Sequence, residues 1–142
     1  MYRQDAPADR PILVTAFNRR LFGIDRATGE IRWSVIREIG DDQIYEIAID
    51  GDIVIAASST QIGFVDYLSG KVHAIVPIGG DARRPLMVVD GGFLYITTTG
   101  QLTCFTTRGQ LVWNQPFKGH GYGPMALGLP GNIRQADDNG KA

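Results

Sequence analysis

Residues that could do chemistry are few and widely separated in this chain of 142 residues. The two histidines, His73 and His120, and the single cysteine, Cys104, do not have the spacing of metal ligands. We expect His73 to face water in an outer strand, and Cys104, between Thr103 and Phe105, to be buried as a small apolar side chain. The sequence therefore predicts no metal centre and no activated thiol.

Two other patterns come close to a catalytic motif without completing one. The stretch Gly119–Gly123 has the glycines of a phosphate-binding loop, but no Gly-Lys-Ser/Thr ending and no helix follow it, so we interpret it as a flexible connection. Asp41 and Asp42 are adjacent loop residues, which usually both face water, and no serine is placed on a strained strand-to-helix turn. We predict no catalytic residues and no cofactor.

Binding is better supported than catalysis, because basic residues gather in the loops predicted to share one edge of the fold. The candidate ligand-binding residues are Arg19, Arg20, Arg83, Arg84, His120 and Tyr122. The same loops also carry the acidic residues Glu38, Asp41, Asp42 and Asp81. Guanidinium groups bind carboxylates and phosphates through paired hydrogen bonds, so this loop face or the central channel could hold a protein or a small ligand, including an acidic peptide or a small anion. The alternative is a polar loop face without a ligand.

Composition excludes several classes of protein. The formal net charge of −1 argues against a general nucleic-acid binder, which would carry a basic excess. A single cysteine excludes a scaffold held together by disulfides. Residues 1–10 form a polar arm without the apolar segment of a signal peptide, and no apolar run approaches the roughly 20 residues of a membrane span. We expect no membrane association and a cytoplasmic location.

A threefold internal repeat indicates the strands and turns that position these residues. A strand, a glycine turn and a second strand occur at residues 21–33, 62–74 and 102–113, the last copy being one residue shorter. Gly29, Gly70 and Gly109 anchor the three turns and lie about 41 and 39 residues apart, as in four-stranded propeller blades. Short runs of Val, Ile, Thr, Phe and Tyr between turn residues predict an all-β fold without helices.

The predicted organisation is a β-propeller with three four-stranded blades, at about residues 11–43, 44–84 and 85–118, the first lacking its first strand. The expected strands are 12–16, 21–25 and 31–36 in blade one, 45–49, 53–57, 62–66 and 72–78 in blade two, and 86–89, 93–98, 102–106 and 111–117 in blade three. A closing strand follows at Met125–Leu129, and residues 131–142 are predicted to form a polar tail.

The motif Asp25-x-x-Thr28-Gly29-Glu30-x-x-Trp33 resembles the repeat of the pyrroloquinoline-quinone-type, or quinoprotein-like, β-propellers. The second copy keeps Asp66, Ser69, Gly70 and Lys71 but has Ala74 in place of tryptophan, and the third has Thr106, Gly109 and Trp113. The resemblance covers about residues 11–118 and implies that these positions are structural. It implies that Trp33 and Trp113 dock against neighbouring blades.

What the resemblance implies about function is less definite. Relatives of this kind include quinone-dependent dehydrogenases, a lipoprotein of the outer-membrane barrel-assembly machine, and binding modules of kinases and sensors, and fold alone does not decide between them. The dehydrogenases need a larger ring, a calcium ion held by Glu, Asn and Asp, and a catalytic Asp. The three short blades show no such set, so quinone catalysis is not expected.

Three blades do not close a ring, because propellers typically have four to eight. We predict that two chains associate head to tail as a homodimer, forming a six-bladed ring in which the closing strand completes the other chain's first blade. Three hypotheses for the function stay open. They are a non-enzymatic scaffold that binds a protein or small ligand, a small hydrolase or lyase acting through His120, Tyr122 and Arg83 or Arg84, and a fragment of a larger propeller.

Overall fold

The computed structural model describes residues 10–36, 38–40, 43–78, 84–121, 123 and 125–134. These residues form antiparallel β-strands and contain no helix, as the sequence predicts. The first sheet consists of β1 (Ile12–Phe17), β2 (Arg20–Asp25) and β3 (Ile31–Ile36). The second consists of β4 (Ile44–Asp50), β5 (Ile53–Ser58), β6 (Gln61–Asp66) and β7 (Val72–Pro77). The third consists of β8 (Met87–Asp90), β9 (Phe93–Thr98), β10 (Gln101–Thr106) and β11 (Leu111–Gln115).

Each sheet is a meander in which consecutive strands pair, so the three sheets are blades one, two and three. Blade one has three strands among the described residues and lacks the inner strand that β4 and β8 provide in the other blades. The predicted strand bounds agree with the structure to within about two residues. The largest difference is at β11, which ends at Gln115 because Pro116 has no amide hydrogen and Phe117 has a left-handed φ of 48°.

A strand lies within the closing strand predicted at 125–129, but the tail predicted for residues 131–142 also contains a strand. Residues 127–134 form a hairpin of β12 (Leu127–Leu129) and β13 (Asn132–Arg134), so a strand begins inside the expected tail. Its two-residue turn, Pro130 and Gly131, is possible because Gly131 adopts a φ of 78°. Two-residue turns at 51–52 and 91–92 join the first two strands of blades two and three. The hairpin therefore repeats the beginning of a blade.

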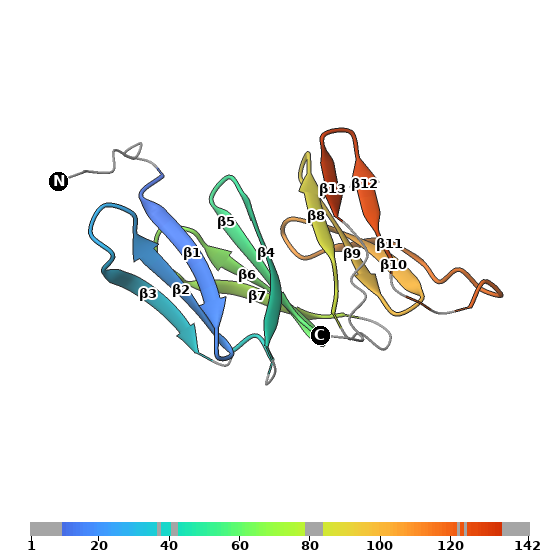
Figure 1. Cartoon of the computed structure of the whole chain (residues 1–142), viewed down its shortest axis with the longest axis horizontal. Coiled ribbons are helices and arrows are strands. Elements are labelled where there is room, and N and C mark those ends of the chain that lie inside the picture. Colours follow the sequence, from blue (N-terminus) through green and yellow to red (C-terminus); the bar gives the residue numbers. More distant parts are fainter. Residues whose placement is uncertain are drawn as a thin grey trace.

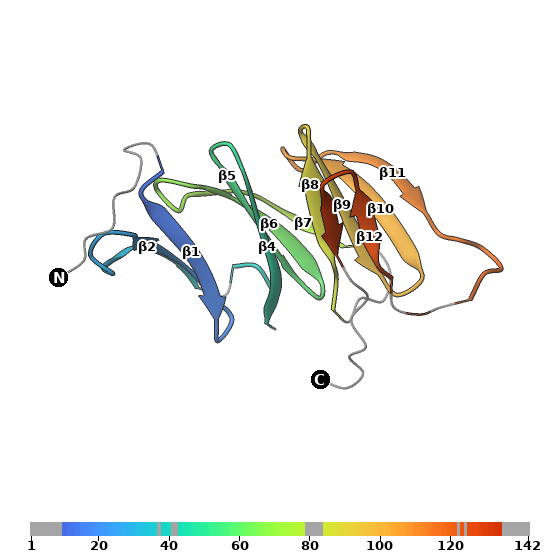
Figure 2. The same cartoon turned by 45° about the horizontal axis from the view of Figure 1, so that its top comes forward.

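The blades stand face to face in chain order, and the β12–β13 hairpin lies beside β8 at the far side of blade three (Figure 1). The same order is visible after rotation (Figure 2). The inner strands β4 and β8 lie against each other. Two apolar layers form the core. One lies between blades one and two around Leu21, Trp33 and Val65, and the other between blades two and three around Phe64 and Leu94.

Candidate functional site

The repeated turn between the last two strands of a blade is held by its own side chains. In blade one, Asp25 Oδ1 accepts hydrogen bonds from the amides of Ala27 (2.8 Å) and Thr28 (3.2 Å). The Thr28 hydroxyl accepts one from the Glu30 amide (3.2 Å), and the Gly29 amide donates to the Asp25 carbonyl (2.9 Å). Gly29 has a φ of 80°, which explains why the motif requires glycine here.

The other two blades build the same turn with different donors and acceptors. In blade two, Asp66 accepts from the Ser69 amide at 2.8 Å. In blade three, the Thr106 hydroxyl takes the place of the carboxylate and accepts from the amides of Arg108 (3.2 Å) and Gln110 (3.1 Å). A hydroxyl on a shorter side chain suits this turn, which is one residue shorter than the others. Asp25, Asp66 and Thr106 are therefore structural residues.

Both carboxylates are stabilised in their charged form. The amide of Ala27 lowers the pKa of Asp25 below its usual range, with further contributions from Thr28 and from Arg32, whose guanidinium lies 2.8 Å away. The hydroxyl and amide of Ser69 lower the pKa of Asp66, and His73 at 3.9 Å adds a smaller effect. His73 thus lies on β7 beside a turn carboxylate, with its side chain partly exposed.

Trp33 joins blade one to blade two, as the resemblance implies. The side chain is only 7% exposed, and its Nε1 donates to the Tyr67 carbonyl of blade two at 2.9 Å. The indole lies against Gly23 of its own blade and against the Gly70 turn of blade two, where a Cβ at Gly70 would be 2.7 Å from Trp33 Cγ. Gly70, in the repeated turn of blade two, therefore makes room for the Trp33 indole of blade one.

Tyr67 completes this contact between the blades, although no motif in the sequence indicates its role. Its hydroxyl donates to the Ile12 carbonyl (2.8 Å) and accepts from the Ile12 amide (2.9 Å). The Arg10 guanidinium carbon lies 5.4 Å from the centre of the Tyr67 ring. Arg26 and Thr107 occupy the corresponding positions in the other blades, so the internal repeat contained no signal for this role.

The contact between blades two and three is filled by a phenylalanine rather than by a tryptophan. Strand pairing places Gly23 opposite Trp33 in blade one and Phe64 opposite Ala74 in blade two. The buried Phe64 ring lies under the Gly109 turn of blade three, where a Cβ at Gly109 would be 3.4 Å from Phe64 Cε2. Phe64 thus fills the space that a tryptophan at position 74 would occupy, which explains why Ala74 departs from the motif.

Trp113 does not contact a following blade within the described chain. It pairs with the buried Cys104, and it is 42% exposed on the outer face of blade three. Its ring lies 6.1 Å from that of Tyr95, centre to centre. An open hollow of about 370 Å³ lies beside it, lined by Leu102, Trp113, Asn114 and Gln115. Burial raises the pKa of the Cys104 thiol, in agreement with its predicted apolar role.

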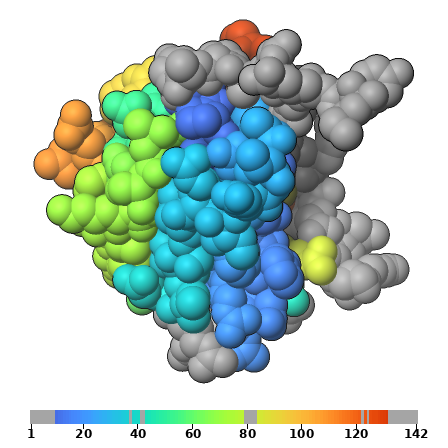
Figure 3. Space-filling model, turned by 90° about the vertical axis from the view of Figure 1, so that its left-hand side faces the viewer, coloured from blue at the N-terminus to red at the C-terminus, as the bar shows by residue number. Residues whose placement is uncertain are grey.

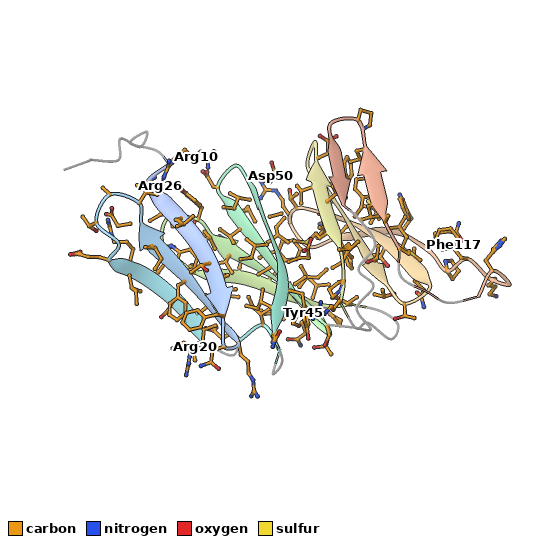
Figure 4. All side chains as sticks on the ribbon, viewed as in Figure 1. Arg10, Arg20, Arg26, Tyr45, Asp50 and Phe117 are labelled. Atoms are coloured by element: carbon orange, nitrogen blue, oxygen red, sulfur yellow. The ribbon has the colours of Figure 1, made fainter. Side chains whose placement is uncertain are left out.

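The candidate ligand-binding residues do not all come together. Arg20 and Tyr45 lie at the same edge of the blades, and Phe117 lies far from both (Figure 4). Arg84 belongs to the Arg20 edge, because its guanidinium carbon is 5.8 Å from the centre of the Tyr45 ring. His120 belongs to the distant loop, since its amide donates to the Phe117 carbonyl at 3.0 Å. The candidates Arg83 and Tyr122 lie outside the described residues, as do Asp41, Asp42 and Asp81.

Arg19 is the most unusual residue of the Arg20 edge. It is exposed and has a left-handed φ of 65°, and it follows Asn18, whose φ is 55°. These two residues form the turn between β1 and β2. The corresponding turn of blade three, between β9 and β10, has Gly100 at the second position, with a φ of 81°. We define Arg19, Arg20, Tyr45 and Arg84 as the arginine edge.

The described part of the chain contains no group of three or more His, Cys, Asp or Glu residues arranged to hold a metal ion. It also has no helix that is long and apolar enough to cross a membrane.

No protein-family model and no curated protein matches this sequence. Among solved structures, the crystal structure of BamB from Moraxella catarrhalis is similar, with a TM-score of 0.59 and 24% identity over 74% of this chain and 33% of that chain. A europium-containing methanol dehydrogenase is also similar, with a TM-score of 0.52 and 17% identity over 80% of this chain and 23% of that chain. The fold is that of a pyrroloquinoline-quinone-type β-propeller.

This assignment concerns the fold, because both identities are below 25%. The chain spans about a third of the length of BamB and under a quarter of that of the methanol dehydrogenase. The cytoplasmic location expected from the N-terminal residues receives no support from these neighbours.

Proposed function

We propose that this chain is a non-enzymatic propeller scaffold that binds an anionic ligand, either an acidic protein segment or a small carboxylate or phosphate, at the arginine edge. The observation that carries the proposal is the conformation of Arg19. A left-handed non-glycine residue costs roughly 1–2 kcal/mol, and glycine avoids this cost at the corresponding turn of blade three. An exposed arginine in place of glycine provides a positive charge at this turn at the cost of backbone strain, as is typical of functional positions.

The surroundings of Arg19 support the same proposal. Arg20 follows it directly, and Arg84 lies over the Tyr45 ring at this edge, in a geometry that orients the guanidinium. Guanidinium groups bind carboxylates and phosphates with two parallel hydrogen bonds, which neutral loop residues do not offer.

Substitution Arg19→Gly tests the proposal because it should change stability and binding in opposite directions. We expect the free energy of unfolding to rise by about 1 kcal/mol as the left-handed strain is relieved. We expect the affinity for a fluorescein-labelled oligoglutamate peptide, measured by fluorescence anisotropy at low salt, to fall about tenfold or more.

Arg108→Ala is the matched control, because this exposed arginine lies in the turn at the other end of β10 from Gly100. It should leave the peptide affinity within about twofold, since it removes the same charge from a different edge. Equal losses for Arg19→Gly and Arg108→Ala would show non-specific attraction, and a wild-type chain that does not bind the peptide would contradict the anionic ligand.

For the assembly we propose a homodimer that closes a six-bladed ring, in which the arginine edge appears twice. The alternative, a part of a larger propeller, is favoured by the chain's share of its neighbours' lengths and by the β12–β13 hairpin that repeats the beginning of a blade. The hydrolase or lyase hypothesis has no specific support, because His120 lies with Phe117, away from Arg20 and Arg84.

A further inference from the structure

The two ends of the blade stack expose apolar positions that the middle blade buries. Leu13 on β1 corresponds to Val54 on β5, since Ile12 pairs with Asp25 as Ile53 pairs with Asp66. Val54 is 0% exposed against blade one, whereas Leu13 is 58% exposed. The side chains of Phe17, Ile31 and Ile36 in blade one are also exposed. Figure 3 looks toward this end, where β1–β3 form the surface. Exposed apolar side chains gathered on one blade are typical of an interaction site.

The opposite end of the stack carries the complementary half of a contact between blades. Between blades one and two, Trp33 docks over the Gly70 turn, and its Nε1 finds the Tyr67 carbonyl. At the outer face of blade three, Trp113 has the same place in the repeat but is half exposed. At the outer end of blade one, Gly29 has the place of Gly70, yet a Cβ there would meet no atom within 4 Å.

The inner strand shows the same complementarity. The β12–β13 hairpin lies against β8 on the side away from β4, where the inner strand of a next blade belongs. Blade one has strands equivalent to β5, β6 and β7 but none equivalent to β4 among the described residues. One molecule therefore offers an inner strand with an uncovered tryptophan at one end. At the other end it offers a blade without an inner strand and with an unused glycine turn.

We propose that the outer face of blade three binds blade one of a second copy of this chain, with Trp113 docked over the partner's Gly29 turn. This inference rests on the proposed homodimer and names its contact residues. The Trp113 indole N–H donates to the carbonyl at position 26, which corresponds to the Tyr67 carbonyl. The hollow beside Trp113 receives the edge of this turn. Two such seams, related by twofold symmetry, close the ring.

Strand pairing completes each seam. The hairpin partner of β12 is the three-residue β13, whereas β1 has six residues and an edge without a partner strand in the described chain. In the dimer β1 of the second copy takes the β13 edge of β12, so that blade one gains its fourth strand and both sheet edges are covered. The rest of each face then buries Leu13 and Phe17 against β9–β11 of the other copy.

The first measurement is the mass of the full chain by light scattering after size exclusion. The expected value is about 31 kDa, twice the 15.5 kDa of one chain. A chain lacking residues 131–142 should keep this mass, because β1 replaces β13. A monomeric full chain would overturn the dimer itself, masses that grow beyond two copies with concentration would overturn the closed ring, and a monomeric truncated chain would overturn the strand exchange.

Single substitutions then locate the seam. Trp113→Ala removes the indole that docks in the proposed seam. Gly29→Ala adds a Cβ at the position that corresponds to Gly70, where a Cβ would clash with Trp33. Each substitution should therefore weaken dimerisation at least tenfold. Leu68→Ala removes a comparably exposed apolar side chain from the blade-two turn, and Gly51→Ala introduces a Cβ at another left-handed glycine with free space. These two controls should remain dimers. If Trp113→Ala also dimerises fully, the seam is wrong while the homodimer stands.

Mixing the two defective variants provides a test that misfolding does not mimic. In a heterodimer of Trp113→Ala and Gly29→Ala, one seam has Trp113 and Gly29 intact, and the other has two alanines that do not clash. We expect the mixture to recover dimers that neither variant forms alone at the same total concentration. Absence of this recovery, with both variants folded by circular dichroism, would overturn head-to-tail docking.

Discussion

At the scale of single residues, the turn side chains are more interchangeable than the motif suggests. The backbone amides of the turn require an oxygen acceptor at the motif's first position, and either a carboxylate or a hydroxyl supplies it. The carboxylates add a dependence on protonation that Thr106 does not have. Asp25 and Asp66 both have their pKa lowered in the fold by hydrogen-bond donors, so they favour the folded state only while they are ionised.

We therefore predict an acid-sensitive contribution from these two residues. A carboxylate with a lowered folded pKa contributes stability that is present above its ordinary value of 3.8 and is lost as the pH falls through the folded value. The double variant Asp25→Asn, Asp66→Asn should be less stable than wild type at about pH 6, and the difference should shrink toward about pH 2. Urea unfolding followed by circular dichroism across this range measures both effects.

Asp52→Asn is the control for the loss of a turn carboxylate outside the repeated turns. At about pH 6 it should reduce the free energy of unfolding less than the double variant does, because Asp52 is not part of a repeated turn. A double variant whose stability difference from wild type is constant with pH would show that the charge of the two aspartates does not matter to the fold.

At the scale of elements, each of the two contacts between blades contains one large aromatic side chain. Either of two paired strands can supply it. Blade one places tryptophan on its last strand opposite glycine, and blade two places phenylalanine on its third strand opposite alanine. The combined volume of the two paired side chains differs less between blades one and two than the volume at either position, as expected for a close-packed layer.

Exchanging the two arrangements should show strong coupling. We predict that Phe64→Gly destabilises the fold by about 3–5 kcal/mol through the cavity under the Gly109 turn, and that Ala74→Trp is destabilising because Phe64 occupies the space. The double variant reproduces the Gly23 and Trp33 pair and should recover at least about 1 kcal/mol relative to the sum of the single changes. Additive effects in urea unfolding would contradict the shared volume.

The repeat allowed the sequence to predict the blades, their turns and the Trp33 contact, because those features recur with fixed spacing. The role of Tyr67 could not be predicted, since its hydroxyl acts between blades and the corresponding residues, Arg26 and Thr107, are chemically different. The C-terminal hairpin was missed because β13 begins within a polar segment, and its strand pairing depends on the turn at Gly131 rather than on apolar alternation. Of the candidate site, the sequence indicated the basic loops but could not separate His120 from Arg20, whose distance depends on the whole blade stack.

At the scale of the whole molecule, a stack of three blades has two uncovered terminal faces, whereas a closed ring has none. Each internal face is covered by a neighbour and buries its apolar residues, but the two terminal faces keep Leu13 and Trp113 in contact with water. The proposed closure of the stack on a second copy would cover both faces and both sheet edges together. In the proposed dimer the free energy of folding would depend on association, and the stability of the protein would change with its concentration.

This dependence gives a prediction for thermal unfolding. For a dimer that unfolds to two chains, a tenfold rise in concentration adds about 1.4 kcal/mol per dimer, and the unfolding entropy of two chains of this size converts that into a Tm increase of about 2 °C. Scanning calorimetry from low to high micromolar chain should show this rise for wild type and for Leu68→Ala. Trp113→Ala should have a lower Tm that does not change with concentration, because this variant is expected to be a monomer and its unfolding involves no dissociation. A wild-type Tm independent of concentration would mean that the terminal faces are stable in water without a second copy.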